Sequence, residues 1–193
     1  MQNASNTESR PANPRWLDLE DDSSFARWRD WKRSLYPVSL AQLTVDIAKP
    51  EHPDAVSIER MRNFLDCYNM VLYRTPDTTE NKALPLRLAA LLGLHTLDSN
   101  LGAGPDAVTE IRVKSSGVHG RYIPYTDRPL SWHTDGYYNS LDKQIRGMAL
   151  HCVRPAKHRG ENELLDHEMA YLHLRELGQD HIRVLSEPDV MTI

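Results

Sequence analysis

Hydrophobic residues in the first half of the chain recur mostly with the period of a helix. Over residues 24–35 the aromatic residues Phe25, Trp28 and Trp31 lie three positions apart, which predicts an amphipathic helix with a buried stripe. The other elements expected in this half are two helices, one beginning near a Ser57 N-cap and one over residues 79–94, and two short strands, residues 43–47 and 70–73.

After about residue 105 the pattern changes to short alternating or apolar runs, which are typical of strands. Strands are expected over residues 109–114, 121–125, 131–135, 144–153 and 162–165. Asp166 is then expected to cap a helix that extends to Leu177, and a shorter helix is expected from Asp180. This order predicts an α+β protein in which a mixed helical region precedes a β-rich half.

Composition and charge restrict the class of protein. The 193 residues suffice for one domain with a sizeable core, or for one domain with an extension. The formal net charge is -4, and the lysines and arginines are scattered along the chain. We therefore expect no basic surface that would attract nucleic acid or an anionic membrane.

The two cysteines, Cys67 and Cys152, exclude a disulfide scaffold and a four-cysteine zinc site. The N-terminal residues 1–14 are polar, lack the apolar core of a signal peptide, and are expected to be a disordered tail. The most apolar segment, residues 84–94, contains Arg87 and is too short to span a bilayer. These features together indicate a cytoplasmic protein.

His133 and Asp135 are the first candidates for chemistry. They are two positions apart on a predicted strand, so both side chains are expected on the same face. One imidazole beside one carboxylate supplies two of the three ligands in the 2-His-1-carboxylate site of non-haem Fe(II) oxygenases. The pair alone is common in strands without any metal, and more of the sequence is needed to decide.

Two longer segments supply that context. The sequences SWHTDGYYNS and GMALHCVRPAKHRGENELLD resemble the taurine dioxygenase (TauD/TfdA) family, including its γ-butyrobetaine hydroxylase branch. In that family a Trp-His-Thr-Asp segment is followed by a strand and then by a Gly-Gly-Asp/Glu segment whose last position is Thr, Ser or Asn. Residues 159–162, Arg-Gly-Glu-Asn, match the second segment, and Asn162 lies 27 residues after Asp135, close to the family's spacing.

The resemblance implies a fold, a cofactor and a co-substrate. The fold is a double-stranded β-helix, or jelly roll, with residues 15–105 as a helical lead-in region and residues 106–193 as the front of the core. His133 and Asp135 would bind Fe(II), and Asn162 would contact 2-oxoglutarate. Dioxygen and a small-molecule substrate would complete the reaction. Substrate contacts are possible at His119, Tyr137 and Tyr138, the two tyrosines by analogy with the hydroxylase branch.

The family also uses a distal His ligand and, about ten residues beyond it, an Arg that pairs with 2-oxoglutarate. After Asn162 the histidines are His167, His173 and His181. His167 and His173 lie six apart on a predicted helix and on different faces, and no Arg follows His181 at that spacing. We therefore expect an incomplete jelly roll, from a chain truncated before these residues, with weak activity.

Two alternatives stay open. One is an inactive fragment that acts as a binding or oligomerisation module, and an open barrel edge would favour association into a homo-oligomer. The other is a cupin-like metalloenzyme that binds a metal but ignores 2-oxoglutarate.

Overall fold

The structure is a computed structural model that describes residues 10, 11, 14–76, 79–98, 103–113, 122–188 and 190. The chain divides into two compact units, one formed by residues 1–79 and 154–193 and the other by residues 80–153. Most of the predicted tail, residues 1–14, and the candidate residue His119 lie outside the described residues.

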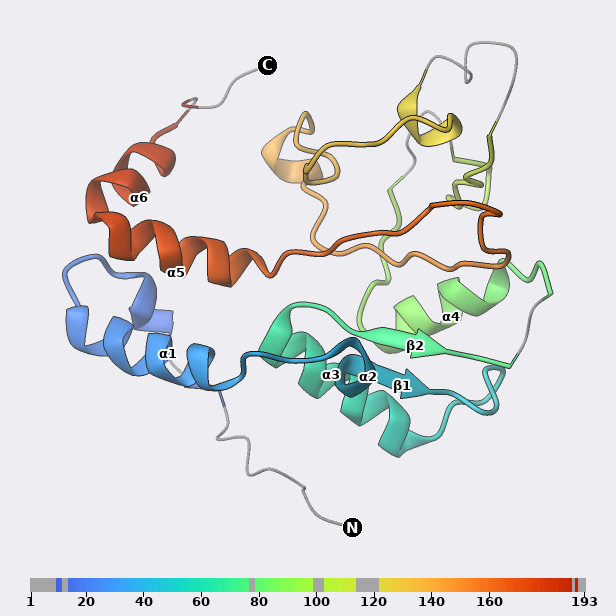
Figure 1. Cartoon of the computed structure of the whole chain (residues 1–193), viewed down its shortest axis with the longest axis horizontal. Coiled ribbons are helices and arrows are strands. Elements are labelled where there is room, and N and C mark those ends of the chain that lie inside the picture. Colours follow the sequence, from blue (N-terminus) through green and yellow to red (C-terminus); the bar gives the residue numbers. More distant parts are fainter. Residues whose placement is uncertain are drawn as a thin grey trace. The chain divides into compact units, whose positions relative to one another are not determined.

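The first unit contains most of the helices in the described part of the chain (Figure 1). They are α1 (Asp22–Ser34), α2 (Leu40–Leu43), α3 (Ala55–Tyr68), α5 (His167–Leu177) and α6 (Gln179–Leu185), preceded by a 3₁₀-helix (Pro14–Leu17). α1 begins at Asp21, whose side chain accepts a hydrogen bond from the Ser24 amide. α5 begins at Asp166, as the sequence predicts. The predicted Ser57 cap is wrong, because Asp54 caps α3 and accepts a hydrogen bond from the Ser57 amide.

The first unit also contains a two-stranded parallel sheet. Strand β1 (Thr44–Asp46) pairs with β2 (Leu72–Arg74), and Val45 lies opposite Tyr73. The connection between them contains α3, which is the usual way for a chain to return to a parallel neighbour. Both strands lie within or beside the segments that the sequence predicts.

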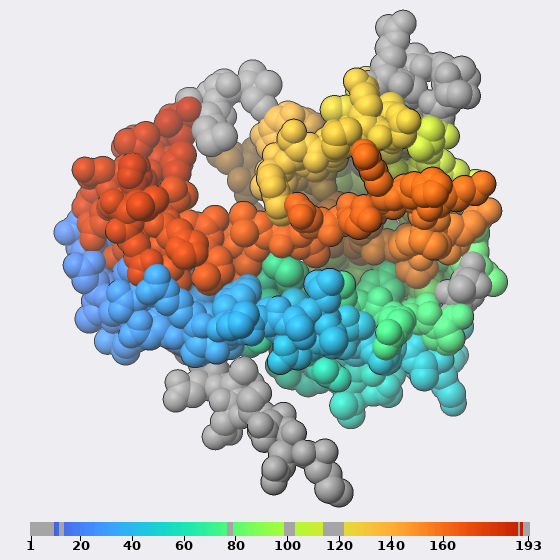
Figure 2. Space-filling view, viewed as in Figure 1, coloured from blue at the N-terminus to red at the C-terminus, as the bar shows by residue number. Residues whose placement is uncertain are grey.

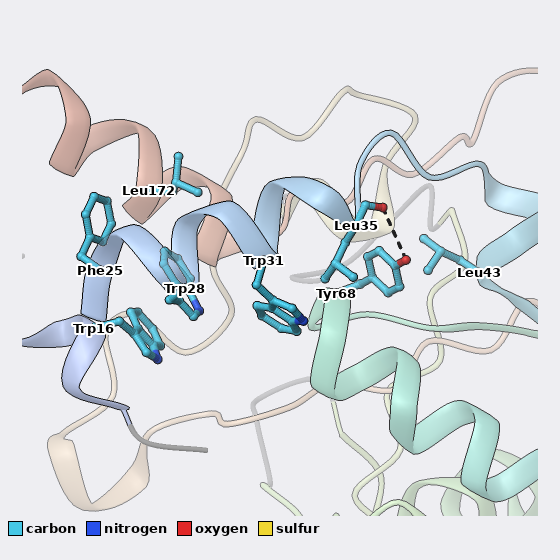
Figure 3. Close-up of a cluster of buried hydrophobic side chains, with 8 residues drawn as sticks. All are labelled: Trp16, Phe25, Trp28, Trp31, Leu35, Leu43, Tyr68 and Leu172. Carbon is cyan, nitrogen blue, oxygen red and sulfur yellow. Dashed lines mark hydrogen bonds between the residues drawn. The ribbon is translucent and has the colours of Figure 1, made fainter. Parts of the chain in front are cut away.

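The core of the first unit is an aromatic cluster on the inner face of α1. It consists of Trp16, Phe25, Trp28, Trp31, Leu35, Leu43, Tyr68 and Leu172 (Figure 3). The rings of Trp16 and Trp28 stack with their centroids 4.1 Å apart, a favourable arrangement for aromatic pairs. Leu172 reaches this cluster from α5 and is fully buried. The predicted aromatic stripe of α1 is therefore confirmed, and α5 completes the core.

A buried charged cluster fixes α5 to α1 beside this core. The Lys32 side chain is fully buried, and its Nζ atom lies 2.6 Å from Asp166 Oδ2 and 2.8 Å from Glu168 Oε2. Asp166 also accepts hydrogen bonds from the Tyr36 hydroxyl at 2.6 Å and the Asn69 amide at 2.8 Å. Burial disfavours the charged form of Asp166, but the hydrogen bonds from Lys32, Tyr36 and Asn69 outweigh it, so its pKa is lowered.

Further polar contacts hold α5 and α6 against the residues around α1. Arg175 is buried and donates a hydrogen bond of 2.6 Å to the Trp16 carbonyl, while its guanidinium lies 4.1 Å from the Phe25 ring centroid. Arg183 of α6 pairs with Glu20 at 2.9 Å. In the space-filling view the red surface of α5 and α6 lies directly on the blue surface of the N-terminal residues (Figure 2).

The second unit has less regular structure. It contains α4 (Ala83–Leu91), which is the most apolar helix, and two 3₁₀-helices, Ile123–Tyr125 and Leu141–Lys143. Lys82 pairs with Asp106 at 3.2 Å and with Glu110 at 2.8 Å. None of the helices in the described part of the chain is long and apolar enough to cross a membrane.

The predicted jelly-roll strands are the main correction to the fold. Within residues 103–113 and 122–165 the structure contains an isolated bridge, Ala103 with Thr109, and no ladder of strands. Alternating residues specify which face of a strand is apolar, but a strand forms only when a neighbour supplies its hydrogen bonds. No other described segment supplies those bonds here, so the predicted strands at 131–135, 144–153 and 162–165 are wrong for this structure. The described parts of the predicted strands 109–114 and 121–125 form no strand either, and Ile123–Tyr125 is a 3₁₀-helix.

Candidate functional site

His133 and Asp135 lie next to each other at the surface of the second unit. The Nε2 atom of His133 lies 3.7 Å from the Oδ1 atom of Asp135. Their side chains are 39% and 47% exposed, so neither belongs to a hydrophobic core. The structure thus brings the two predicted ligands together, although they are not on a strand.

A turn of the chain follows directly after Asp135. Gly136 adopts a positive φ of 64°, a conformation that glycine adopts without steric cost. The Asn139 amide donates a 2.8 Å hydrogen bond to the Gly136 carbonyl, and the Asn139 side chain donates one of 2.9 Å to the Lys143 carbonyl. A Cβ atom at Gly136 would overlap the Ile145 side chain. The chain therefore reverses immediately after the carboxylate, which leaves its side chain accessible.

The other ring nitrogen of His133 has a local partner. Its Nδ1 atom lies 2.8 Å from the carbonyl oxygen of Ser131, two residues earlier in the chain. The sequence analysis did not identify this contact, because a backbone carbonyl leaves no signal in the residue types.

The donor atoms of the pair fit part of an Fe(II) site. An imidazole nitrogen and a carboxylate oxygen are the ligand types of a facial 2-His-1-carboxylate site. Two ligands bound at right angles to one octahedral ion, each at about 2.1 Å, lie about 3 Å apart. The separation of 3.7 Å is only slightly longer, and both side chains are exposed enough to close it. Among the described residues, no group of three His, Cys, Asp or Glu side chains is arranged to hold a metal ion.

Asn162, the predicted 2-oxoglutarate contact, belongs to the first unit, whereas His133 and Asp135 belong to the second. It is exposed, and its side-chain amide lies 3.4 Å from the Gly160 carbonyl. Arg159 and Gly160 both have positive φ, at 59° and 90°, and they follow a bend of the chain at residues 157 and 158. The weak local contact leaves the amide of Asn162 available to an acceptor on another molecule.

Exposed aromatic side chains flank the His133 and Asp135 pair. Trp132 is 65% exposed, and Tyr137 and Tyr138 are similarly accessible. The two tyrosine rings make an edge contact with centroids 5.2 Å apart. Large aromatic residues on the surface beside polar ligands are typical of a binding site that is covered when occupied or assembled.

Comparison with known families identifies the family of the chain. The family model of the taurine catabolism dioxygenase TauD, TfdA family matches residues 33–192, which is most of the chain. The chain belongs to this family. A search of curated proteins and a search of solved structures each gave no match.

Membership confirms the class that the resemblance indicated. Members of this family are typically Fe(II)- and 2-oxoglutarate-dependent dioxygenases that use dioxygen and a small-molecule substrate, and the family implies a jelly-roll fold. The matched range includes both of the segments that carry the resemblance, around His133 and around Asn162.

Proposed function

We propose that this chain carries part of the active site of an Fe(II)- and 2-oxoglutarate-dependent dioxygenase that hydroxylates a small molecule. The observation that carries the proposal is the 3.7 Å approach of His133 Nε2 and Asp135 Oδ1 within a chain of this family. The Leu-His-Cys run at 150–152, ahead of the Asn162 segment, favours the γ-butyrobetaine hydroxylase branch.

Each residue has a role that follows from its chemistry. His133 offers a nitrogen lone pair and Asp135 a carboxylate oxygen to Fe(II), and Asn162 donates its side-chain N–H to a carboxylate of 2-oxoglutarate. When bound, the iron and its 2-oxo acid supply the activation of dioxygen for attack on a C–H bond. The aromatic side chains beside the pair, Trp132, Tyr137 and Tyr138, provide apolar surface for the substrate.

The proposed site needs two more groups, a third ligand and an Arg that pairs with the far carboxylate of 2-oxoglutarate. The three histidines after Asn162 lie on the helices α5 and α6 and not on strands. Arg183 follows His173 by ten residues, but it pairs with Glu20 at 2.9 Å. We infer that these histidines do not complete the site, and that the chain is the front part of a longer dioxygenase. Residues 15–105 would be the helical lead-in and residues 106–193 the first part of the jelly roll.

An activity assay tests this proposal. The chain is incubated with Fe(II), ascorbate and 2-oxoglutarate, and succinate is measured over time. We expect little or no succinate from this chain alone, and rapid turnover would contradict the inference that the site is incomplete.

A binding measurement tests the metal ligands separately. Fe(II) affinity is measured without oxygen for the wild type, for His133→Ala and for His173→Ala, an exposed histidine on α5 that serves as the control. We expect weak binding that His133→Ala abolishes and His173→Ala leaves unchanged. Equal affinity in all three proteins would contradict the proposed ligand. Metal binding that 2-oxoglutarate does not strengthen would favour a cupin-like metalloenzyme.

A second candidate function is supported by the exposed apolar residues of the second unit. Leu141 is 83% exposed, Met148 60% and Leu150 52%, and exposed apolar patches often mark association surfaces. On this alternative the chain is an inactive module that binds a partner or forms a homo-oligomer. Sedimentation velocity over a hundredfold range of protein concentration tests this alternative. A module of this kind should associate as its concentration rises, without Fe(II) or 2-oxoglutarate. We also propose that the protein is cytoplasmic, and its two free cysteines support this location.

A further inference from the structure

We propose that the carbonyl of Ser131 holds the neutral His133 ring in its Nδ1–H tautomer, so that the lone pair of Nε2 is directed toward Asp135. The relevance of this tautomer to metal binding rests on the proposed function, because a metal ligand must offer a lone pair. The tautomer itself is a property of this chain in the absence of any metal. Ser131 is therefore a positioning residue, and it acts through its backbone.

The geometry around the ring supports this assignment. The distance between His133 Nδ1 and the Ser131 carbonyl oxygen is 2.8 Å, which is an ordinary hydrogen-bond length. A carbonyl oxygen only accepts hydrogen bonds, so the proton of the neutral ring must lie on Nδ1. The opposite tautomer would place a nitrogen lone pair against the carbonyl lone pairs.

The second nitrogen faces a different group. His133 Nε2 lies 3.7 Å from Asp135 Oδ1, which is too long for a hydrogen bond. Asp135 therefore gains little from a proton on Nε2 and does not compete strongly with the Ser131 carbonyl. The two contacts together leave Nε2 unprotonated, on the side of the ring where the second ligand lies.

A histidine side chain in water favours the Nε2–H form, so the Ser131 contact reverses the usual preference. A single hydrogen bond of ordinary net strength changes a two-state equilibrium by about fivefold. In metal sites the ring nitrogen that does not bind the ion commonly donates to a carbonyl or carboxylate, which fixes the tautomer and the ring orientation. Here the donor and acceptor are two residues apart in the sequence. The contact is therefore local and does not depend on the strands of a jelly roll.

Nitrogen NMR of the uniformly ¹⁵N-labelled full chain at pH 8 tests the proposal. At this pH a histidine side chain in water is neutral. The His133 signals are assigned by their loss in His133→Ala, and the exposed helical residues His173 and His181 serve as internal references. We expect His133 to show the Nδ1–H pattern and the two references to show the Nε2–H pattern usual in water.

Two variants separate the proposed cause from other causes. Ser131→Ala keeps the carbonyl and should leave the tautomer unchanged. Asp135→Asn removes the charge of the carboxylate that lies 3.7 Å from Nε2 and should also leave the Nδ1–H form predominant. An Nε2–H pattern in the wild type overturns the proposal, and so does a tautomer that switches in Asp135→Asn, because Asp135 would then control the ring.

Addition of Zn²⁺ as a diamagnetic probe distinguishes this inference from the proposed function. An upfield shift at His133 Nε2, with Nδ1 remaining protonated, supports both. An Nδ1–H pattern that Zn²⁺ does not affect supports the tautomer and contradicts the metal-ligand role of His133.

Discussion

Two tryptophans show how differently the two units of the chain are packed. Trp28 of the first unit is completely buried against the stacked ring of Trp16, whereas Trp132 of the second unit is 65% exposed. The first unit obtains its core from its own helices. The residues around the proposed iron ligands keep large apolar side chains in water, which costs free energy until something covers them. The well-packed unit and the unit that contains the proposed iron ligands are thus different.

The same contrast holds for two lysines that each face two carboxylates. Lys32 is fully buried between Asp166 and Glu168, while the side chain of Lys82 is 45% exposed between Asp106 and Glu110. Water screens the second cluster and not the first. Removal of the Lys32 charge should therefore lower the free energy of unfolding considerably, whereas removal of the Lys82 charge should change it little.

The largest effect is expected from Lys32→Met. This change keeps the length of the side chain but removes the buried cation from Asp166 and Glu168, of which Glu168 still pairs with Arg10. It should lower the free energy of unfolding by about 3 kcal/mol or more. Urea denaturation followed by circular dichroism measures it, with Lys82→Met as the matched control in the second unit. A control that is destabilised as much as Lys32→Met would show that the two clusters do not differ as their burial indicates.

The next effect tests whether α5 belongs to the core of the first unit. Leu172 is fully buried, and Leu172→Ala should lower the free energy of unfolding by about 3 kcal/mol through lost burial and a cavity. Leu177→Ala changes a residue of the same helix that is 76% exposed, and should alter stability by less than about 0.5 kcal/mol. Similar urea midpoints for the two variants would contradict the docking of this face of α5.

A smaller effect concerns pH. The lowered pKa of Asp166 means that its contribution to stability is complete above its ordinary pKa of about 3.9 and is lost as the pH falls through the lower folded-state value. The urea concentration at the unfolding midpoint should therefore decrease as the pH is lowered below about 4. Asp166→Asn should make this decrease smaller. Asp142→Asn, at an exposed position of the second unit, is the control. Identical acid profiles for the wild type and Asp166→Asn would disprove the prediction.

The smallest effect is local to the turn after Asp135. Gly136→Ala places a Cβ atom at a positive φ and against Ile145, at a cost of about 1 kcal/mol, which should speed hydrogen exchange of the Asn139 amide roughly fivefold. Gly93 also has a positive φ, but nothing lies near its missing Cβ atom. Gly93→Ala should leave the Asn139 amide unaffected, and neither change should alter the unfolding of the first unit.

Local patterns in the sequence predicted the helices well. The aromatic spacing of α1 and the Asp166 cap of α5 depend on residues close in the sequence, and both are confirmed. The strands at 131–135 and 144–153 were wrong, because a strand requires a partner segment that alternation does not reveal. The charged cluster was missed, although Lys32 lies four residues after Trp28 and one after Trp31, on the apolar side of its helix. A lysine in that position indicates a buried partner.

The candidate site was predicted in part. The two-residue spacing of His133 and Asp135 keeps their side chains close, at 3.7 Å, even without a strand, because the chain between them is so short. Their roles as ligands, and that of Asn162, remain predictions. The contact with the Ser131 carbonyl depends on backbone conformation, which residue types do not specify.

The buried pair of Lys32 and Glu168 also has a consequence for biosynthesis. Its partners are separated by 136 residues, so the ribosome needs roughly 7 to 27 seconds between them at the usual rates of translation. During that interval the inner face of α1, with its tryptophans, has no α5 to cover it. The nascent chain should therefore be a substrate for chaperones that bind exposed aromatic segments until α5 has emerged.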